Sequence, residues 1–99
     1  MARLIWSEQS VDDLRSIAEF IAKDSVKFAK LTVSKIRTTA RYLIEHPYIG
    51  KVVTEIGKKE IREMIIGNYR LIYKVNIDKT VEIITVHHSA KQLYPDIIK

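Results

Sequence analysis

The chain has no cysteine, only three glycines and two prolines among its 99 residues, and no long apolar run. Without cysteine it has neither disulfide bonds nor thiolate metal sites, which agrees with a reducing cytoplasm. The sequence turns acidic and polar after Trp6, so we expect neither a signal peptide nor a membrane span. There is no glycine-rich phosphate loop, nucleophile elbow or cofactor fingerprint. We therefore expect no cofactor and no metal, and any catalysis would have to use Arg, Lys, His, Glu and Tyr.

What the chain does contain is typical of a folded globular protein: 46% apolar and 29% charged residues. Its length predicts a single domain over residues 1–99 with one modest core. The net charge of +5 and the pI near 9.5 favour an anionic partner, which can be RNA, DNA or an acidic protein. A solvated basic surface without a partner has the same composition.

The first half of the chain predicts a short strand and two helices. Residues 3–6 form the strand, and Ser7 caps a helix whose apolar stripe is Val11, Leu14, Ile17, Ala18, Ile21 and Ala22. Residues 24–25 break the pattern and begin a second helix of about five turns, with its stripe at Ala29, Val33, Ile36, Ala40 and Leu43. His46 and Pro47 end it, because proline disfavours a helical conformation at the preceding residue. The short connection predicts an antiparallel helical hairpin.

The second half predicts a sheet that covers this hairpin. We expect a strand over 51–56, a turn over 57–59, a β-hairpin over 61–75, a turn over 76–79 and a last strand over 80–87. In the last strand, alternation places Val81, Ile83 and Thr85 on one face and Ile84 and Val86 on the other, so it is expected to be central. The fold class is α+β: an N-terminal strand and an antiparallel helical hairpin packed on one face of a small antiparallel β-sheet.

The β-hairpin carries two arginines, and its turn determines where they point. A two-residue loop at 67–68 places Arg70 opposite Ile65 on one face and Arg62 opposite Tyr73 on the other. A longer loop would shift the register by one residue and bring both arginines to one side. The sequence leaves this choice open.

The same register places Arg70 diagonal to Glu63. Either the two form a partly exposed cross-strand ion pair that contributes little to the stability of the fold, or the charges belong to a binding surface on the open face of the sheet.

His87 and His88 end the last strand. Adjacent strand residues point to opposite faces, so the two are a poor metal site, although one can act as a general acid or base. Strand-end histidines that form ordinary hydrogen bonds at the surface are the simpler interpretation of the pattern.

The second helix carries a basic stripe on one face: Lys27, Lys30, Arg37 and Arg41. Such a stripe can contact phosphates or an acidic partner, or it can simply be solvated.

A series of short segments runs through nearly the whole chain in a fixed order: Leu4-Ile5-Trp6-Ser7, Asp13-Leu14-x-x-Ile17, Phe20-Ile21, His46-Pro47-x-x-Gly50, Ile61-Arg62-Glu63, Gly67-Asn68-Tyr69-Arg70-Leu71-Ile72-Tyr73, Val81-x-Ile83-x-x-Val86-x-His88 and Lys91-x-Leu93. In this order and spacing the segments resemble the RelE/ParE superfamily of bacterial toxins. The resemblance implies a cytoplasmic toxin of a type II toxin–antitoxin system with the fold predicted above. It also implies a hetero-oligomer in which the C-terminal segment of a cognate antitoxin wraps around the toxin.

The resemblance implies two alternative targets. RelE-like members cut mRNA on the ribosome, and here Arg70 would stabilise phosphate charge, with His88 and Glu63 as acid/base candidates. ParE-like members inhibit DNA gyrase and are not nucleases. Their Tyr-Arg-x-x-Tyr strand and final His-x-x-Arg segment are closer to this chain, although Lys91 replaces the arginine.

We therefore expect a ParE-like inhibitor of DNA gyrase, with a RelE-like endoribonuclease as the alternative and a non-toxic basic binding module as the second alternative. The candidate residues for binding the target or partner are Arg62, Tyr73, Lys91, His87, Lys27, Lys30, Arg37 and Arg41.

Overall fold

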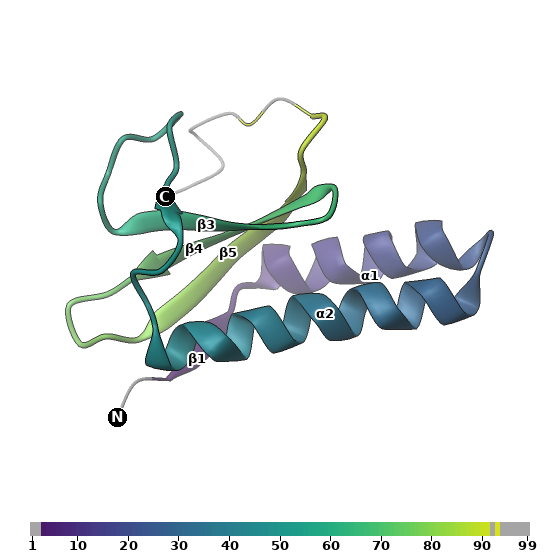
Figure 1. Cartoon of the computed structure of the whole chain (residues 1–99), viewed down its shortest axis with the longest axis horizontal. Coiled ribbons are helices and arrows are strands. Elements are labelled where there is room, and N and C mark those ends of the chain that lie inside the picture. The colour runs from purple at the N-terminus through teal and green to yellow at the C-terminus, as the bar shows by residue number, and fades with distance from the viewer. Residues whose placement is uncertain (1–2, 92, 94–99) are drawn as a thin grey trace.

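The computed structural model describes residues 3–91 and 93, which form one layer of helices beside one layer of strands (Figure 1). The elements in chain order are β1 (Leu4–Trp6), α1 (Glu8–Ala22), α2 (Val26–Glu45), β2 (Lys51–Val52), β3 (Ile61–Ile66), β4 (Tyr69–Val75) and β5 (Val81–His88). The α+β class predicted from the sequence is confirmed. Neither helix in these residues is long and apolar enough to cross a membrane.

The two helices begin and end where the sequence predicts. The Ser7 hydroxyl accepts a hydrogen bond from the Ser10 amide, and the Ser25 hydroxyl accepts one from the Phe28 amide, each at 3.0 Å. These bonds satisfy amides that have no partner within the first turn of a helix. At the other end of α2, His46 is the C-cap residue and directly precedes Pro47.

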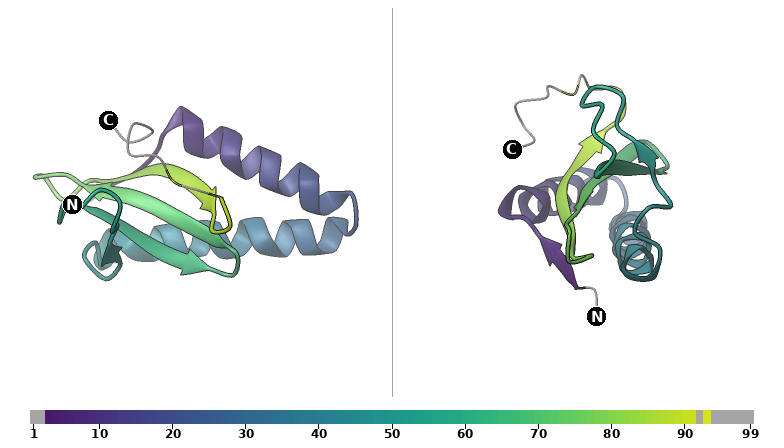
Figure 2. Two further views of the ribbon diagram at one scale, coloured as in Figure 1. Left: turned by 90° about the horizontal axis from the view of Figure 1, so that it is seen from above. Right: turned by 90° about the vertical axis from the view of Figure 1, so that its left-hand side faces the viewer.

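The sheet has the order β1-β5-β4-β3-β2 and twists strongly when it is viewed end-on (Figure 2). Strands β2 to β5 pair antiparallel as predicted, but β1 pairs with β5 in parallel, so the sheet is mixed. The reason lies at the start of α1, where the Ser7 amide donates to the Ile83 carbonyl and its hydroxyl donates to the Ile84 carbonyl. These bonds fix β1 beside β5, which makes β5 central, as predicted.

The β3–β4 hairpin has the predicted two-residue loop. Gly67 has a φ of 57°, and Arg70 lies opposite Ile65 while Arg62 lies opposite Tyr73. The register that the sequence left open is therefore the simpler of the two.

The predicted alternation in β5 is wrong beyond Ile83, because the strand contains a bulge. Tyr73 pairs with Ile83 and Ile72 pairs with Thr85, so Ile84 is an extra residue. As a result Val86 joins Ile83 in the core beneath the helices, while Ile84 packs with the cluster on the other face. The Asp13 carboxylate of α1 accepts from the Val86 amide at 2.9 Å and from the Thr85 hydroxyl, which holds the helix against this bulge.

The face of the sheet opposite the helices is partly covered by the chain itself. Strand β2 ends at Val52 rather than at residue 56, and the following loop folds over the sheet. Its apolar side chains form a second, smaller core with residues of the sheet and the C-terminal segment: Val53, Ile56, Ile61, Ile72, Ile84 and Leu93. The loop leaves the β2 edge because burying these apolar side chains stabilises the fold more than extending an edge strand would.

Candidate functional site

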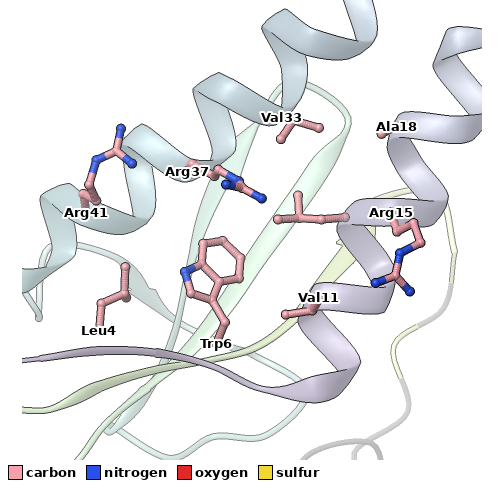
Figure 3. Close-up of a pocket in the computed structure, with 9 residues that line it drawn as sticks. Leu4, Trp6, Val11, Arg15, Ala18, Val33, Arg37 and Arg41 are labelled. Carbon is pink, nitrogen blue, oxygen red and sulfur yellow. The ribbon is translucent and has the colours of Figure 1, made fainter.

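An apolar groove lies between α1 and α2, where the helices diverge toward β1 (Figure 3). We call it the helical groove. It consists of two adjoining cavities of about 530 and 600 Å³ that share Ala18, Val33, Arg37 and Arg41. The apolar lining continues with Leu4, Trp6, Val11, Leu14, Ala22, Val26 and Ala29.

The groove exists because the apolar stripes of the two helices are only partly buried by the sheet. In α1, Leu14 is 6% exposed and belongs to the core, whereas Val11 is 42% exposed and faces the groove. In α2, Ile36 is fully buried, whereas Val26 is 59% exposed. The short side chains of Ala18, Ala22 and Ala29 leave the space between the helices unfilled.

The basic stripe of α2 borders this groove. Lys30, Arg37 and Arg41 line it, and Lys27 lies just beyond, in the next hollow along the helix. Arg15 of α1 adds a fourth cation to the lining, and Glu19 is the carboxylate among the lining residues. The sequence analysis missed Arg15, and a comparison of the charges beside both helical stripes would have found it.

On the other face of the sheet, Arg70 is bound by two carboxylates. Its Nε and Nη2 donate to Glu63 at 2.6 and 3.2 Å, and its Nη1 and Nη2 donate to Glu55 at 2.8 and 2.9 Å. We call these three side chains the Arg70 cluster. It ties the loop after β2 to the middle of the sheet.

The cluster differs from the partly exposed pair expected from the sequence. The Glu63 side chain is only 3% exposed and that of Arg70 only 12%. The hydrogen bonds that Arg70 donates to Glu55 and Glu63 raise its pKa, so the guanidinium stays charged. Its charge is therefore more than balanced by two carboxylates, and most of its donors are occupied.

The cluster makes acid stability depend on Glu55. Hydrogen bonds from Arg70, then from its own backbone amide, lower the pKa of Glu55 from 4.5 to about 2. A lowered pKa stabilises the fold above the unfolded value, and this stabilisation is lost as the pH falls from 4.5 toward 2. We predict that Glu55→Gln lowers the thermal midpoint near neutral pH and that this difference disappears near pH 2, measured by circular dichroism melts. A difference that is constant with pH would contradict this assignment.

Arg62 and Tyr73, the other two candidate residues of the β-hairpin, make contacts within the fold. Arg62 donates to the carbonyls of Lys59, Tyr48 and Gly50 and lies over the Tyr48 ring. The Tyr73 side chain is fully buried, and burial raises the pKa of its hydroxyl, which accepts from the Gly50 amide.

The two histidines lie apart, as predicted. His87 pairs across the sheet with Arg70, and its Nε2 is 2.9 Å from the carbonyl of Lys91. His88 points to the helical side, where its Nδ1 accepts from the Ala90 amide and its ring meets that of Tyr69 edge-on. The proposed set of Arg70, Glu63 and His88 is therefore split between the two faces of the sheet.

No cluster of three His, Asp or Glu side chains that would suit a metal ion occurs in residues 3–91 and 93.

The sequence is similar over almost its full length to a ParE toxin model, to the Y4kP protein and to a RelE toxin. A sequence model described as the ParE toxin of the type II toxin–antitoxin system parDE matches residues 4–93. The chain is 31% identical to the Y4kP protein of Sinorhizobium fredii over 97% of this chain and 96% of that protein. It is 26% identical to the toxin RelE2 of Caulobacter vibrioides, over 92% of this chain and 99% of that toxin.

Solved structures show the same fold at low sequence identity. A chain of the chromosomal ParDE system of P. aeruginosa matches with a TM-score of 0.69 at 15% identity, over 89% of this chain and 96% of that chain. A chain of the RelBE2 toxin–antitoxin complex of Mycobacterium tuberculosis matches with a TM-score of 0.63 at 20% identity, over 88% and 96%. The chain therefore belongs to the ParE toxin family of type II toxin–antitoxin systems.

Proposed function

We propose that this toxin stops growth by inhibiting DNA gyrase and that it is not a ribonuclease. The observation that carries this proposal is the Arg70 cluster. Arg70 is the arginine that a RelE-like mechanism would use on the scissile phosphate, and here Glu55 and Glu63 occupy its donors. A phosphate approaching this guanidinium would also meet the excess negative charge of the two carboxylates.

The positions of the other candidate catalytic residues support the same conclusion. A general acid or base must lie within hydrogen-bond reach of the proton that it transfers. His88 lies on the helical side of the sheet, and Glu63 is buried beneath Arg70. His87 shares the face of Arg70, but its Nε2 contacts the backbone of the turn that follows β5.

Two assays on the purified toxin test the target. We expect the toxin to inhibit supercoiling of relaxed plasmid by DNA gyrase and to leave ribosome-bound mRNA intact. Cleavage of ribosome-bound mRNA that is abolished in Arg70→Ala, provided that this variant is still folded, would overturn the proposal in favour of the endoribonuclease.

We further propose that the helical groove binds the cognate antitoxin, through an amphipathic helix with an acidic face. The apolar lining can accept leucine-sized side chains, and Arg15, Lys30, Arg37 and Arg41 border it with positive charge. Complementary charge raises the rate of association and selects the partner. The partner is then a small protein with an acidic C-terminal segment, encoded in the neighbouring gene.

The double variant Arg37→Glu/Arg41→Glu tests this groove. We expect its antitoxin affinity to fall by about a hundredfold, mainly through slower association, because each reversal places like charges together. Surface plasmon resonance at several salt concentrations measures both the rate and its salt dependence. The matched control is Lys23→Glu together with Lys35→Glu, which removes the same charge from exposed positions that line neither groove cavity. Equal losses in both double variants would argue against the groove.

A further inference from the structure

The end of the molecule opposite the α1–α2 turn carries a second exposed surface, around the turn that joins β4 to β5 (Figures 1 and 2). We call it the turn surface and define it by Ile77, Lys79, Tyr48, Arg3, Lys59 and Lys74. Apart from Lys79, these residues line one hollow of about 800 Å³, and the Lys79 amine lies 5.0 Å from the centre of the Tyr48 ring. The turn surface has no residue in common with the helical groove.

Ile77 is the most exposed large apolar residue described, with a relative accessibility of 103%. It does not stand on a loose loop. The Asn76 amide donates to the Thr80 carbonyl, the Lys79 amide donates to the Asn76 carbonyl, and the Thr80 amide donates to the Asp78 carboxylate, each at 2.9 Å. These bonds hold the backbone of the turn, whereas the exposed Ile77 side chain contributes nothing to the fold. It can fill a recess in a partner without the entropic cost of ordering the turn.

Lys79 gives an independent indication that this turn has a function besides reversing the chain. Its φ is 69°, in the left-handed region that glycine and asparagine adopt more readily. A glycine here would form the turn with less strain, but it would lose the amine that lies over Tyr48. Strained residues of this kind are concentrated at binding sites.

The charge of the turn surface indicates the chemistry of its partner. Three of its four cations, Arg3, Lys59 and Lys74, share the hollow with two carboxylates, Glu60 and Asp78. The Asp78 carboxylate already accepts a hydrogen bond from the turn backbone. Within residues 3–91 and 93, no ion pair involves Arg3, Lys59 or Lys74. The surface is therefore positive, and it favours an acidic partner.

We propose that the turn surface is where this toxin docks on an acidic surface of its target protein, with the Ile77 side chain inserted in an apolar recess. This inference rests on the proposed function, since it assumes that the target is a protein. Ile77 and the neighbouring Ile5, 40% exposed, favour protein over nucleic acid, because aliphatic side chains contribute nothing to phosphate binding. An aromatic ring, cations and an exposed aliphatic side chain together are typical of protein interfaces.

Two variants of the full-length toxin test the turn surface, with growth arrest after induction and inhibition of purified DNA gyrase as readouts. We expect Ile77→Asp and Lys79→Gly each to raise the half-inhibitory toxin concentration at least about tenfold, as loss of an interface anchor does. The matched controls are Phe20→Asp and Lys23→Glu, at exposed positions near the α1–α2 turn, which we expect to act like the natural sequence.

A stability measurement separates a lost contact from a lost fold. Because Ile77 is fully exposed and glycine suits the φ of residue 79, neither variant should lower the thermal midpoint, and Lys79→Gly should raise it. A more stable toxin with weaker activity is a result that a purely structural role for Lys79 does not give.

The possible outcomes separate the two proposals. If both variants arrest growth and inhibit gyrase like the natural toxin, the docking surface is wrong and the gyrase proposal stands. If the natural toxin arrests growth without inhibiting gyrase, the gyrase proposal is wrong. In that case, loss of growth arrest in both variants still supports docking of the turn surface on a target protein other than gyrase.

Binding to a single-stranded oligonucleotide, measured by fluorescence anisotropy, tests the nucleic-acid alternative. If the variants lose growth arrest together with affinity for the oligonucleotide, the partner is a nucleic acid and the inference is overturned. A natural toxin that arrests nothing overturns both proposals.

Discussion

Arg70→Ala is expected to destabilise the protein by about 3–5 kcal/mol, because it leaves the buried Glu63 carboxylate without its cation. A domain of this size has a total stability of about 5–15 kcal/mol, so the loss is a large part of it. Urea unfolding followed by circular dichroism measures the difference. The matched control is Arg15→Ala, which removes an ion pair to Asp12 whose side chains are 65% and 59% exposed, and which should cost less than about 1 kcal/mol.

A second substitution identifies the cause of this instability. Glu63→Gln added to Arg70→Ala removes the buried charge that has lost its cation, so it should recover part of the loss near neutral pH. A cost of Arg70→Ala no larger than that of Arg15→Ala, or no recovery in the double variant, would mean that the cluster is not the buried ion pair that its distances suggest.

Features of this fold that depend on neighbouring residues were predictable from the sequence. The Gly67–Asn68 pair predicted the β-hairpin and limited its register to two alternatives, because glycine readily adopts the positive φ of a tight turn; the structure has the simpler register. Ser7 and Ser25 predicted both helix starts, because their hydroxyls satisfy free amides in the first turn.

Features that depend on distant residues were not predictable in the same way. The second carboxylate on Arg70 comes from Glu55, which lies 15 positions earlier in a segment that was predicted to be a strand but folds as a loop. The bulge at Ile84 moves the side chains that follow it in β5 to the face opposite the one predicted by alternation. Isoleucine at that position gives no indication of a bulge. The helical groove was missed for a third reason: an amphipathic stripe predicts which face is apolar but not how much of it the sheet covers.

Gly50 explains one of the motifs shared with the toxin family, and its substitution gives the second large expected effect. A Cβ at this position would lie 2.5 Å from the Tyr73 hydroxyl oxygen and 2.6 Å from the Glu63 carbonyl oxygen. The tyrosine is fully buried and the carbonyl belongs to β3, which is paired with a strand on each side, so neither can move easily. We expect Gly50→Ala to destabilise the protein by about 3 kcal/mol and to lower the thermal midpoint by roughly 12–24 °C. The matched control is Gly57→Ala, which has open space around it but a φ of 71°, and which should cost only about 1 kcal/mol.

Coupling between Gly50 and Tyr73 distinguishes a steric effect from a backbone effect. The Gly50 amide donates to the Tyr73 hydroxyl at 3.0 Å, so Tyr73→Phe alone should cost about 1–3 kcal/mol by leaving that amide unsatisfied. Tyr73→Phe also removes the atom nearest to the new Cβ, so in the double variant the alanine meets the Glu63 carbonyl oxygen at 2.6 Å and the ring carbon Cε1 at 3.0 Å. The cost of the double variant should therefore be smaller than the sum of the single costs by about 1 kcal/mol or more. Strict additivity would place the whole penalty on these two remaining contacts, and the glycine would then not be required by the tyrosine hydroxyl.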